Sequence, residues 1–417
     1  MSSDVMIWII AAVAAAGVIL RPFHLPEAIW AVAGAALLVM LRLISIPQAL
    51  TGAAKGTDVY LFLFGMMLLA EIAREEGLFD WLAAIATSHA KGSARRLFLL
   101  TYGVGTIVTI FLSNDATAVV LTPAVAAAVK TAKTEQPLPY LLICAFIANA
   151  ASFVLPISNP ANLVIYGSHM PPLLRWLPAY LLPSALSIIA TYLALRWTQR
   201  NALHQTIAME VPRPALTAAG KTAAFGIAAT AVVLLASSTL GVPLGLPTAV
   251  AGAVTAAVIL LLGQTALWTI IKNISWGVLP LVAGLFVLVE GLDQTGLIGT
   301  ITTWLQNGAE RSAVWTASAA GVGVAVVSNV INNLPTGLIA GTAVQAAQVS
   351  DQVTRSILIG VDLGPNLSVT GSLATILWLT ALRREGHSVG FGAFLRLGIV
   401  VMPPALLLAI GAAWLLS

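Results

Sequence analysis

Cysteine, charge and aromatic residues are all scarce in this chain of 417 residues. Its single cysteine, Cys144, excludes a disulfide framework and any multi-cysteine metal site. Only 9% of the residues are charged, whereas 59% are hydrophobic and the mean hydropathy is +0.95. Polar groups are therefore too few to cover a water-soluble globule. We expect an all-α integral membrane protein that lies in the lipid bilayer.

Motifs of several other functional classes are missing too. The sequence has no nucleotide-binding P-loop and no zinc-ligand spacing, and its five histidines fall in loops or near the ends of apolar runs. Its basic residues are scattered at the ends of those runs, which is typical of orientation anchors rather than of a nucleic-acid surface. We therefore expect no enzyme activity, no metal, no cofactor and no nucleic-acid partner.

A polar segment, Ser113–Thr117, interrupts the apolar sequence between Leu97 and Val129. Irregular backbone at membrane depth is tolerated only where protein or a watery cavity satisfies its polar groups. The segment therefore predicts a re-entrant hairpin whose tip faces a site. A shift of 219 positions lays the end of a second polar stretch, Ser328–Thr336, over it, matching Asn114 with Asn333.

The same shift holds upstream of the hairpins. It pairs Gly65, Leu69, Glu71, Gly77 and Leu78 with Gly284, Leu288, Glu290, Gly296 and Leu297. One unchanged offset over about eighty residues indicates an internal repeat. Two similar halves, each with a polar break in apolar sequence, are typical of a repeat-built secondary transporter.

The predicted organisation follows from this repeat. The first half covers residues 1–197, with a hairpin at 94–132 and a helix at 138–168 that is broken at Leu155–Pro160. Residues 198–221 form a cytoplasmic linker. The second half covers residues 222–417, with a hairpin at 313–349 and a broken helix at 353–382. Segments 78–90 and 297–304 read as interfacial helices. Each half then has five transmembrane spans, and an odd number of spans makes the two repeats inverted.

The distribution of basic residues predicts the orientation. If the first hairpin opens to the cytoplasm, fifteen of the 20 lysine and arginine residues lie on the cytoplasmic side. The five others, Arg42, Lys55, Arg175, Arg311 and Arg355, lie outside. This division follows the positive-inside rule and places both termini outside a bacterial-type cytoplasmic (inner) membrane.

The uncharged polar residues of the hairpin tips and broken helices are the predicted substrate ligands. They are Asn114, Thr117, Ser158, Asn159, Asn162, Asn332, Asn333, Thr336, Thr370 and Ser372. Such residues are also good helix N-caps, and capping alone is the structural alternative. Capping does not explain why polar breaks occur in four separate segments.

Two acids are predicted to couple transport to protons. Asp115 lies at the first tip, and its counterpart after the shift is Leu334, so the repeated fold needs no carboxylate there. Asp362 falls in the predicted break of the second broken helix. An acid inside the membrane is costly and is a functional candidate. The alternative is a carboxylate that stays ionised because backbone N–H groups satisfy it.

Other charged groups give fewer indications. Glu71 and Glu290 match across the repeat at the ends of equivalent spans, where they act either functionally or as structural caps. No lysine or arginine falls in any break, which argues against a dicarboxylate or tricarboxylate substrate. A small neutral polyhydroxy solute, or a cation, fits better.

Three motifs resemble the ion transporter superfamily, and within it the ArsB family of arsenical-resistance efflux pumps. They are SNDATAVVLTP at 113–123, SNVINNLPTGLI at 328–339 and GVDLGPNLSVTGSLATILW at 360–378. The first is shared broadly across the superfamily, and the last looks specific for the arsenite branch. The resemblance implies export of arsenite and antimonite in exchange for protons, sometimes with a soluble ATPase subunit. The chain departs from the pattern at Asn149, where relatives carry an acid.

Other functions are also compatible with the sequence. The same acids suit a sodium/proton antiporter, and the same superfamily contains silicate exporters. A passive channel or a non-transporting scaffold accounts poorly for inverted halves with matched breaks.

Overall fold

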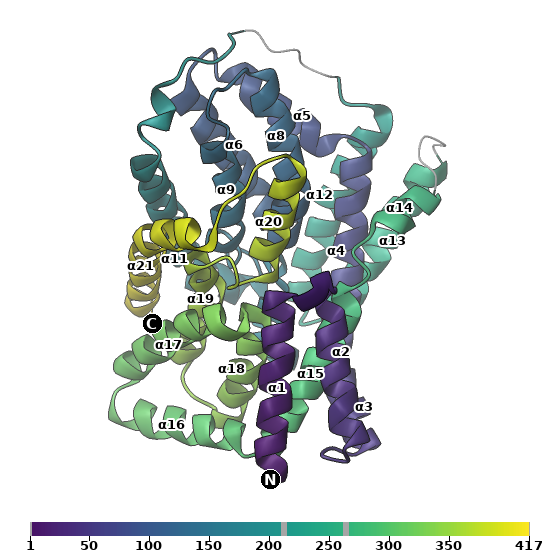
Figure 1. Ribbon diagram of the computed structural model, residues 1–417, viewed down its shortest axis with the longest axis vertical. Coiled ribbons are helices and arrows are strands. Elements are labelled where there is room, and N and C mark those ends of the chain that lie inside the picture. Colours follow the sequence, from purple (N-terminus) through teal and green to yellow (C-terminus); the bar gives the residue numbers. More distant parts are fainter. Residues whose placement is uncertain (1, 210–214, 262–266, 417) are drawn as a thin grey trace.

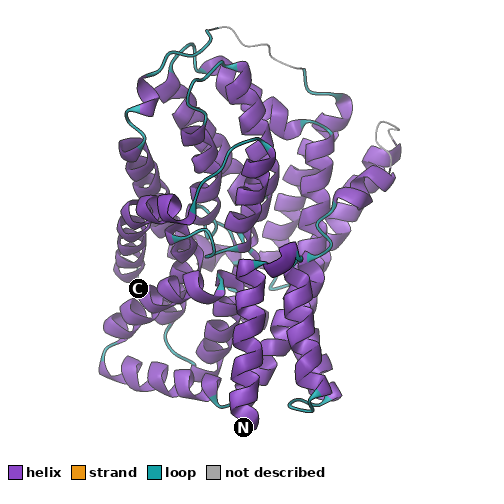
Figure 2. Ribbon diagram, in the orientation of Figure 1, coloured by secondary structure: helices purple, strands orange, loops and turns teal. Residues whose placement is uncertain are grey.

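Helices make up the regular structure of this protein. The computed structural model describes residues 2–209, 215–261 and 267–416, and within those ranges it contains helices and loops with no strand (Figure 2). The predicted all-α fold is confirmed. Residues 210–214, which belong to the predicted linker, lie outside the described ranges.

The same order of helices occurs twice along the chain. The helices of the first half are α1 Ser3–Leu20, α2 Glu27–Met40, α3 Ile46–Ala54, α4 Thr57–Glu75, α5 Leu78–His89, α6 Ala94–Phe111, α7 Asn114–Ala116, α8 Thr122–Thr131, α9 Leu138–Ala150, α10 Pro160–Tyr166 and α11 Leu173–Thr198. A short π-helical segment, Thr117–Leu121, joins α7 to α8. The helices of the second half are α12 Ala218–Thr239, α13 Gly245–Leu261, α14 Leu267–Asn273, α15 Val278–Gln294, α16 Leu297–Arg311, α17 Ala313–Ile331, α18 Asn333–Ala347, α19 Asp351–Leu363, α20 Leu373–Arg384 and α21 Phe391–Leu415.

The two halves are inverted relative to each other. Figure 1 shows the group α5, α6 and α8 at one end of the molecule and the equivalent group α16, α17 and α18 at the other. The hairpin α6–α8 therefore enters from the end opposite to the hairpin α17–α18. Each half also contains one broken helix, α9–α10 or α19–α20, as predicted.

The repeat offset changes after the hairpins. The connection between α18 and α19 is shorter than the one between α8 and α9, so α9 begins at Leu138 and α19 begins at Asp351, an offset of 213. The prediction that Asp362 lies in the second break is wrong, because α19 continues to Leu363. Asp362 occupies the last turn of α19, and the non-α-helical stretch runs from Gly364 to Ser372. Under the new offset its equivalent is Asn149 in the last turn of α9.

Two short helices were absent from the prediction. They are α3 and α14, which precede α4 and α15 at equivalent places. A capping box begins α3, since Ser45 Oγ accepts from the Gln48 N–H at 3.3 Å and Gln48 Oε1 accepts from the Ser45 N–H at 2.8 Å. The second predicted interfacial helix is also longer than expected, because α16 continues to Arg311.

Length and composition identify the membrane-crossing helices. Six described helices are long and apolar enough to cross, or up to eight if each of two bent pairs is one span. This number is below ten because α2, α9 and α13 are shorter apolar helices and the broken helices divide their spans.

Glycine allows the halves to cross closely. In the first half α4 packs against α13 of the second half, and α15 packs in return against α2. A Cβ atom on Gly65 of α4 would lie 2.3 Å from the Thr248 carbonyl oxygen, and one on Gly284 of α15 would lie 2.7 Å from the Ala31 carbonyl carbon. These two glycines are the matched pair of the repeat. Both positions exclude a side chain because the partner backbone occupies its place.

Substitution of Gly65 by alanine is expected to destabilise the protein. The added methyl group meets backbone atoms that cannot rotate away, and overpacking of this kind costs about 1–3 kcal/mol. Thermal unfolding of the purified protein in detergent measures the effect. Gly103→Ala in α6 is the matched control, since no heavy atom lies within 4 Å of its added Cβ. Equal melting temperatures for the two variants would contradict the close crossing.

Candidate functional site

Four interruptions of helical structure meet at one small pocket, which we call the central pocket. Its volume is about 20 Å³, which is room for about one water molecule. Its polar lining comes from both hairpin tips and from the start of α10. The polar residues are Asn114, Asp115, Asn159 and Asn333, and the apolar ones are Leu63, Pro160, Val278, Val282, Leu334, Leu373 and Ala374.

Helix capping builds the four segments around the pocket. Ser113 Oγ accepts from the Ala116 N–H at 3.1 Å, and Asn332 Oδ1 accepts from the Leu334 N–H at 3.3 Å. In the broken helices, Asn159 Oδ1 accepts from the Ala161 N–H at 3.0 Å, and Ser372 Oγ accepts from the Thr375 N–H at 3.1 Å. Each cap begins a helix at the pocket, so the positive ends of these helices point toward it. Capping and pocket formation thus occur together at these breaks.

Asp115 lies on the wall between two spaces. It lines the central pocket and also a cavity of about 580 Å³, which we call the α4 cavity because α4 forms one wall of it. Within the described part of the chain its carboxylate has no hydrogen bond or ion pair, whereas its backbone N–H donates to Asn114 Oδ1 at 2.9 Å. The carboxylate is therefore free to interact with a solute or a proton.

Asp362 lies one layer behind the pocket. Its side chain is fully buried and accepts hydrogen bonds from Ser152 Oγ at 2.6 Å and from Asn159 Nδ2 at 2.8 Å. Asn159 also lines the central pocket. The second half thus holds a pocket residue of the first half through a buried carboxylate.

The equivalent residue, Asn149, makes the reciprocal contact. Its Nδ2 atom donates to Asn366 Oδ1 at 3.0 Å and lies 3.3 Å from Thr375 Oγ1, both in the second half. Each broken helix therefore sends one polar side chain into the break of the other. Only one of the two, Asp362, can carry a charge.

Several predicted ligands brace the breaks and do not line the central pocket. They bond to neighbouring backbone or hydroxyl groups: Thr117 to Thr109 Oγ1 at 2.8 Å, Ser158 to the Ile110 oxygen at 2.9 Å, Asn162 to the Ser152 oxygen at 2.9 Å, Thr336 to the Asn332 oxygen at 2.7 Å and Thr370 to the Asn329 oxygen at 3.0 Å. Asn332 Nδ2 also reaches the Thr370 oxygen at 3.3 Å. Their hydrogen bonds hold irregular backbone in place inside apolar surroundings.

Sequence reasoning did not single out several members of this network. Ser152 contacts Asp362, and Asn329 donates to the Gly364 oxygen at 2.9 Å while accepting from Ser368 Oγ at 2.8 Å. Asn329 is visible in the sequence as a polar residue near the end of an apolar run. Its partners are 35 and 39 residues away, so the run alone does not reveal them.

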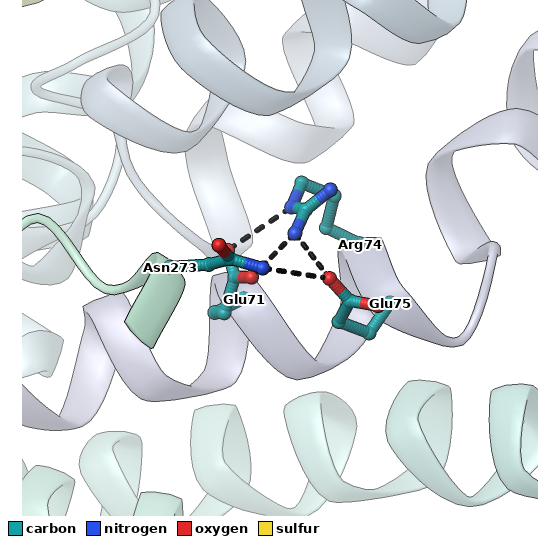
Figure 3. A network of polar contacts seen from close by, with 4 residues as sticks. All are labelled: Glu71, Arg74, Glu75 and Asn273. Atoms are coloured by element: carbon teal, nitrogen blue, oxygen red, sulfur yellow. Dashed lines mark hydrogen bonds and ion pairs between the residues drawn. The ribbon is translucent and has the colours of Figure 1, made fainter. Parts of the chain in front are cut away.

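A charged cluster lies on the wall of the α4 cavity (Figure 3). Arg74 donates to Glu71 through Nε at 3.0 Å and Nη2 at 2.5 Å, and it also pairs with Glu75. Asn273, at the end of α14 in the second half, donates to Glu75 at 3.1 Å. The cluster joins the two halves beside the cavity.

The matched acid Glu290 has a different partner. It pairs with Lys55, which follows α3, at 2.7 Å. Neither Glu71 nor Glu290 lines the central pocket. Both matched acids are held in ion pairs, each with a cation of the first half.

Comparison with known proteins places this architecture among membrane transporters. A relative from Escherichia coli, named arsenical pump membrane protein, is 25% identical over 83% of both chains. A protein of the same name from Yersinia enterocolitica is 26% identical over the same shares. The crystal structure of the Alcanivorax borkumensis YdaH transporter, described as having an unusual topology, superposes with a TM-score of 0.56 at 13% identity, covering 88% of this chain and 86% of that one. The resemblance to arsenical pumps is confirmed.

The family model CitMHS, described as citrate transporter, matches residues 5–361. Because that match covers most of the chain, this protein is a member of the CitMHS transporter family.

Proposed function

We propose that this transporter exports trivalent arsenite, and antimonite, from the cytoplasm in exchange for protons. The observation that carries the proposal is the lining of the central pocket: three asparagine side chains and one carboxylate, with no lysine or arginine among its described residues. The name shared by the curated relatives, arsenical pump membrane protein, supports the same substrate class.

The pocket chemistry suits an uncharged trihydroxide. Arsenous acid is neutral near pH 7 and presents three hydroxyl groups, each of which donates and accepts hydrogen bonds. The amides of Asn114, Asn159 and Asn333 each offer an oxygen acceptor and two N–H donors. Asp115 supplies a further acceptor when ionised. Oxygen and nitrogen ligands of this kind also release arsenic more readily than thiolates would.

Citrate fits the same pocket poorly. Its carboxylates need cationic or abundant donor groups, and Asp115 would repel them. Three cations, Arg74, Lys272 and Arg384, do line the wider α4 cavity. Arg74 is already paired with Glu71 and Glu75. We therefore assign citrate transport as the second candidate, favoured only by the description of the family.

Transport is proposed to proceed by alternating access. The central pocket is too small for arsenous acid, so loading requires its walls to separate. One wall of the α4 cavity comes from α4 and the α14–α15 connection, and the opposite wall comes from the first hairpin, α10 and α20. Relative movement of these walls opens the pocket to this cavity, which we place on the cytoplasmic side with both termini outside. Asp115 and Asp362 are proposed to carry the coupled protons.

Transport in proteoliposomes tests the proposal. Purified protein is reconstituted into liposomes, and arsenite uptake is measured with and without an imposed pH gradient. We expect uptake that needs the gradient, that antimonite inhibits and that citrate leaves unchanged. Citrate uptake without arsenite uptake would show that citrate, and not arsenite, is the substrate. Sodium-dependent proton movement that ignores arsenite would favour the antiporter, and uptake indifferent to pH would favour a channel.

A further inference from the structure

A second large cavity lies across the central pocket from the α4 cavity. It has a volume of about 720 Å³ and is lined by the C-terminal end of α10, the end of α18 and the starts of α11 and α19. We call it the α10 cavity. The inverted equivalents α10 and α20 both begin at the central pocket, and α10 leads to this cavity whereas α20 leads to the α4 cavity. The two cavities therefore approach the pocket from opposite sides.

Two tyrosine hydroxyls occupy the inner wall of the α10 cavity. Tyr166, at the end of α10, and Tyr180, in α11, both line it, and their Oη atoms are 2.8 Å apart. Tyr180 is only 1% exposed, so its hydroxyl reaches water only through Tyr166 or the cavity. The pair forms a short hydrogen-bonded chain that leads from the cavity into the protein.

Two adjacent residues, Ser152 and Phe153, lie between Tyr180 and Asp362 in the network of contacts. The ring of Tyr180 packs edge-on against Phe153, with centroids 6.4 Å apart. The next residue back, Ser152, donates to the Asp362 carboxylate at 2.6 Å. The adjacent residues Phe153 and Ser152 therefore connect the Tyr180 ring with the buried carboxylate of Asp362.

The charged and titratable groups around the Tyr166–Tyr180 pair lie mostly on the side of the α10 cavity. Those that line the cavity are His169, Arg175, Asp351 and Arg355. Arg355 donates to the Leu416 oxygen at 3.5 Å and lies 3.9 Å from the Asp351 carboxylate. The positive charge of Arg355 therefore offsets the negative charge of Asp351. At the inner end, Asp362 faces the uncharged donors Ser152 and Asn159.

We propose that Tyr166 and Tyr180 form a proton relay from the α10 cavity to Asp362. This inference rests on the proposed function and names the route by which the exchanged proton enters. A proton from cavity water binds Tyr166 Oη, and Tyr166 passes its own hydroxyl proton to Tyr180 Oη. Tyr180 passes its hydroxyl proton through an intervening water to the Asp362 carboxylate. One proton leaves the cavity, one proton binds Asp362, and both tyrosines end neutral.

Removal of either hydroxyl tests the relay in proteoliposomes. Tyr166→Phe and Tyr180→Phe keep the rings and interrupt the chain. We expect each variant to lose at least about tenfold of its arsenite uptake driven by a pH gradient. The double variant loses no more than either single one, because the groups act in series. Exchange of arsenite for arsenite, which moves no net proton, stays within about twofold of the wild type.

Tyr102→Phe is the matched control, since that buried hydroxyl donates to the Ile188 oxygen at 2.7 Å and lies outside the cavity. Its gradient-driven uptake should equal that of the wild type. If both relay variants kept full gradient-driven uptake, the relay would be overturned and the proposed function would stand. The same conclusion would follow if arsenite-for-arsenite exchange fell as much as gradient-driven uptake, because that result indicates a structural role for the tyrosines. Wild-type protein that transports no arsenite would overturn the proposed function and the relay together.

Discussion

Asp115→Asn is expected to abolish proton-driven arsenite export while the protein folds normally. The carboxylate lines both the central pocket and the α4 cavity, and no hydrogen bond in the described part of the chain depends on it. Asparagine has nearly the same size and keeps the backbone contact with Asn114. It cannot release or bind a proton, so the coupling step fails. We expect gradient-driven uptake to fall at least about a hundredfold.

Uptake of arsenite into proteoliposomes at a series of external pH values measures this effect. Asp4→Asn is the matched control, because Asp4 is also an acid in the first turn of a helix but is exposed at the start of α1. Thermal unfolding of both variants should match that of the wild type. If Asp115→Asn retained its uptake and its pH dependence, Asp115 would not be the proton carrier.

Two substitutions of Asp362, by asparagine and by leucine, are expected to have different effects on transport and stability. Asparagine can still accept from Asn159 Nδ2, and its amide can donate to Ser152 Oγ, so Asp362→Asn keeps the hydrogen bonds and loses only the charge. We expect normal stability and a loss of gradient-driven uptake of at least about a hundredfold. Leucine removes the acceptor of Asn159 Nδ2 in a buried site, whereas the Ser152 hydroxyl keeps the Asn149 oxygen as an acceptor at 2.8 Å. Asp362→Leu should therefore lose about 1–3 kcal/mol of stability for the unsatisfied Asn159 amide.

Thermal unfolding in detergent and arsenite uptake together separate these two effects. Asn149→Leu, at the equivalent position of the other half, is a useful comparison because it removes contacts to Asn366 and Thr375 without removing a charge. It should lower stability as Asp362→Leu does. A fully active Asp362→Asn protein would show that the carboxylate is structural, and the tyrosine relay would then lead to no proton acceptor.

Much of the fold could be predicted because the repeat contains polar residues that are unusual inside apolar sequence. Polar residues such as Asn114 and Asn333 stand out against apolar sequence, and one constant offset joins them. The helices α3 and α14 were missed because they are short and lack a long apolar run. The crossing of α4 with α13 could not be predicted, since Gly65 is informative only when the backbone opposite it is known.

The sequence predicted which segments form the candidate site, but it did not predict which of their side chains line the central pocket. Asn114, Asp115, Asn159 and Asn333 do line the central pocket. Thr117 has the same polar character, but its hydroxyl turns back into the first hairpin toward Thr109. A pattern of residue types places a break in the chain. It does not give the rotamer or the distant partner that decides which way a side chain points.

The reciprocal crossings of α4 with α13 and of α15 with α2 also bear on how this protein is synthesised. While a ribosome has made only the first 197 residues, α2 and α4 sit in the bilayer before their partners exist. The Gly65 face of α4 and the Ala31 face of α2 contact lipid until α13 and α15 are inserted. Neither half should survive quality control when expressed by itself, and two separate gene fragments should yield active protein only when translated in the same cell.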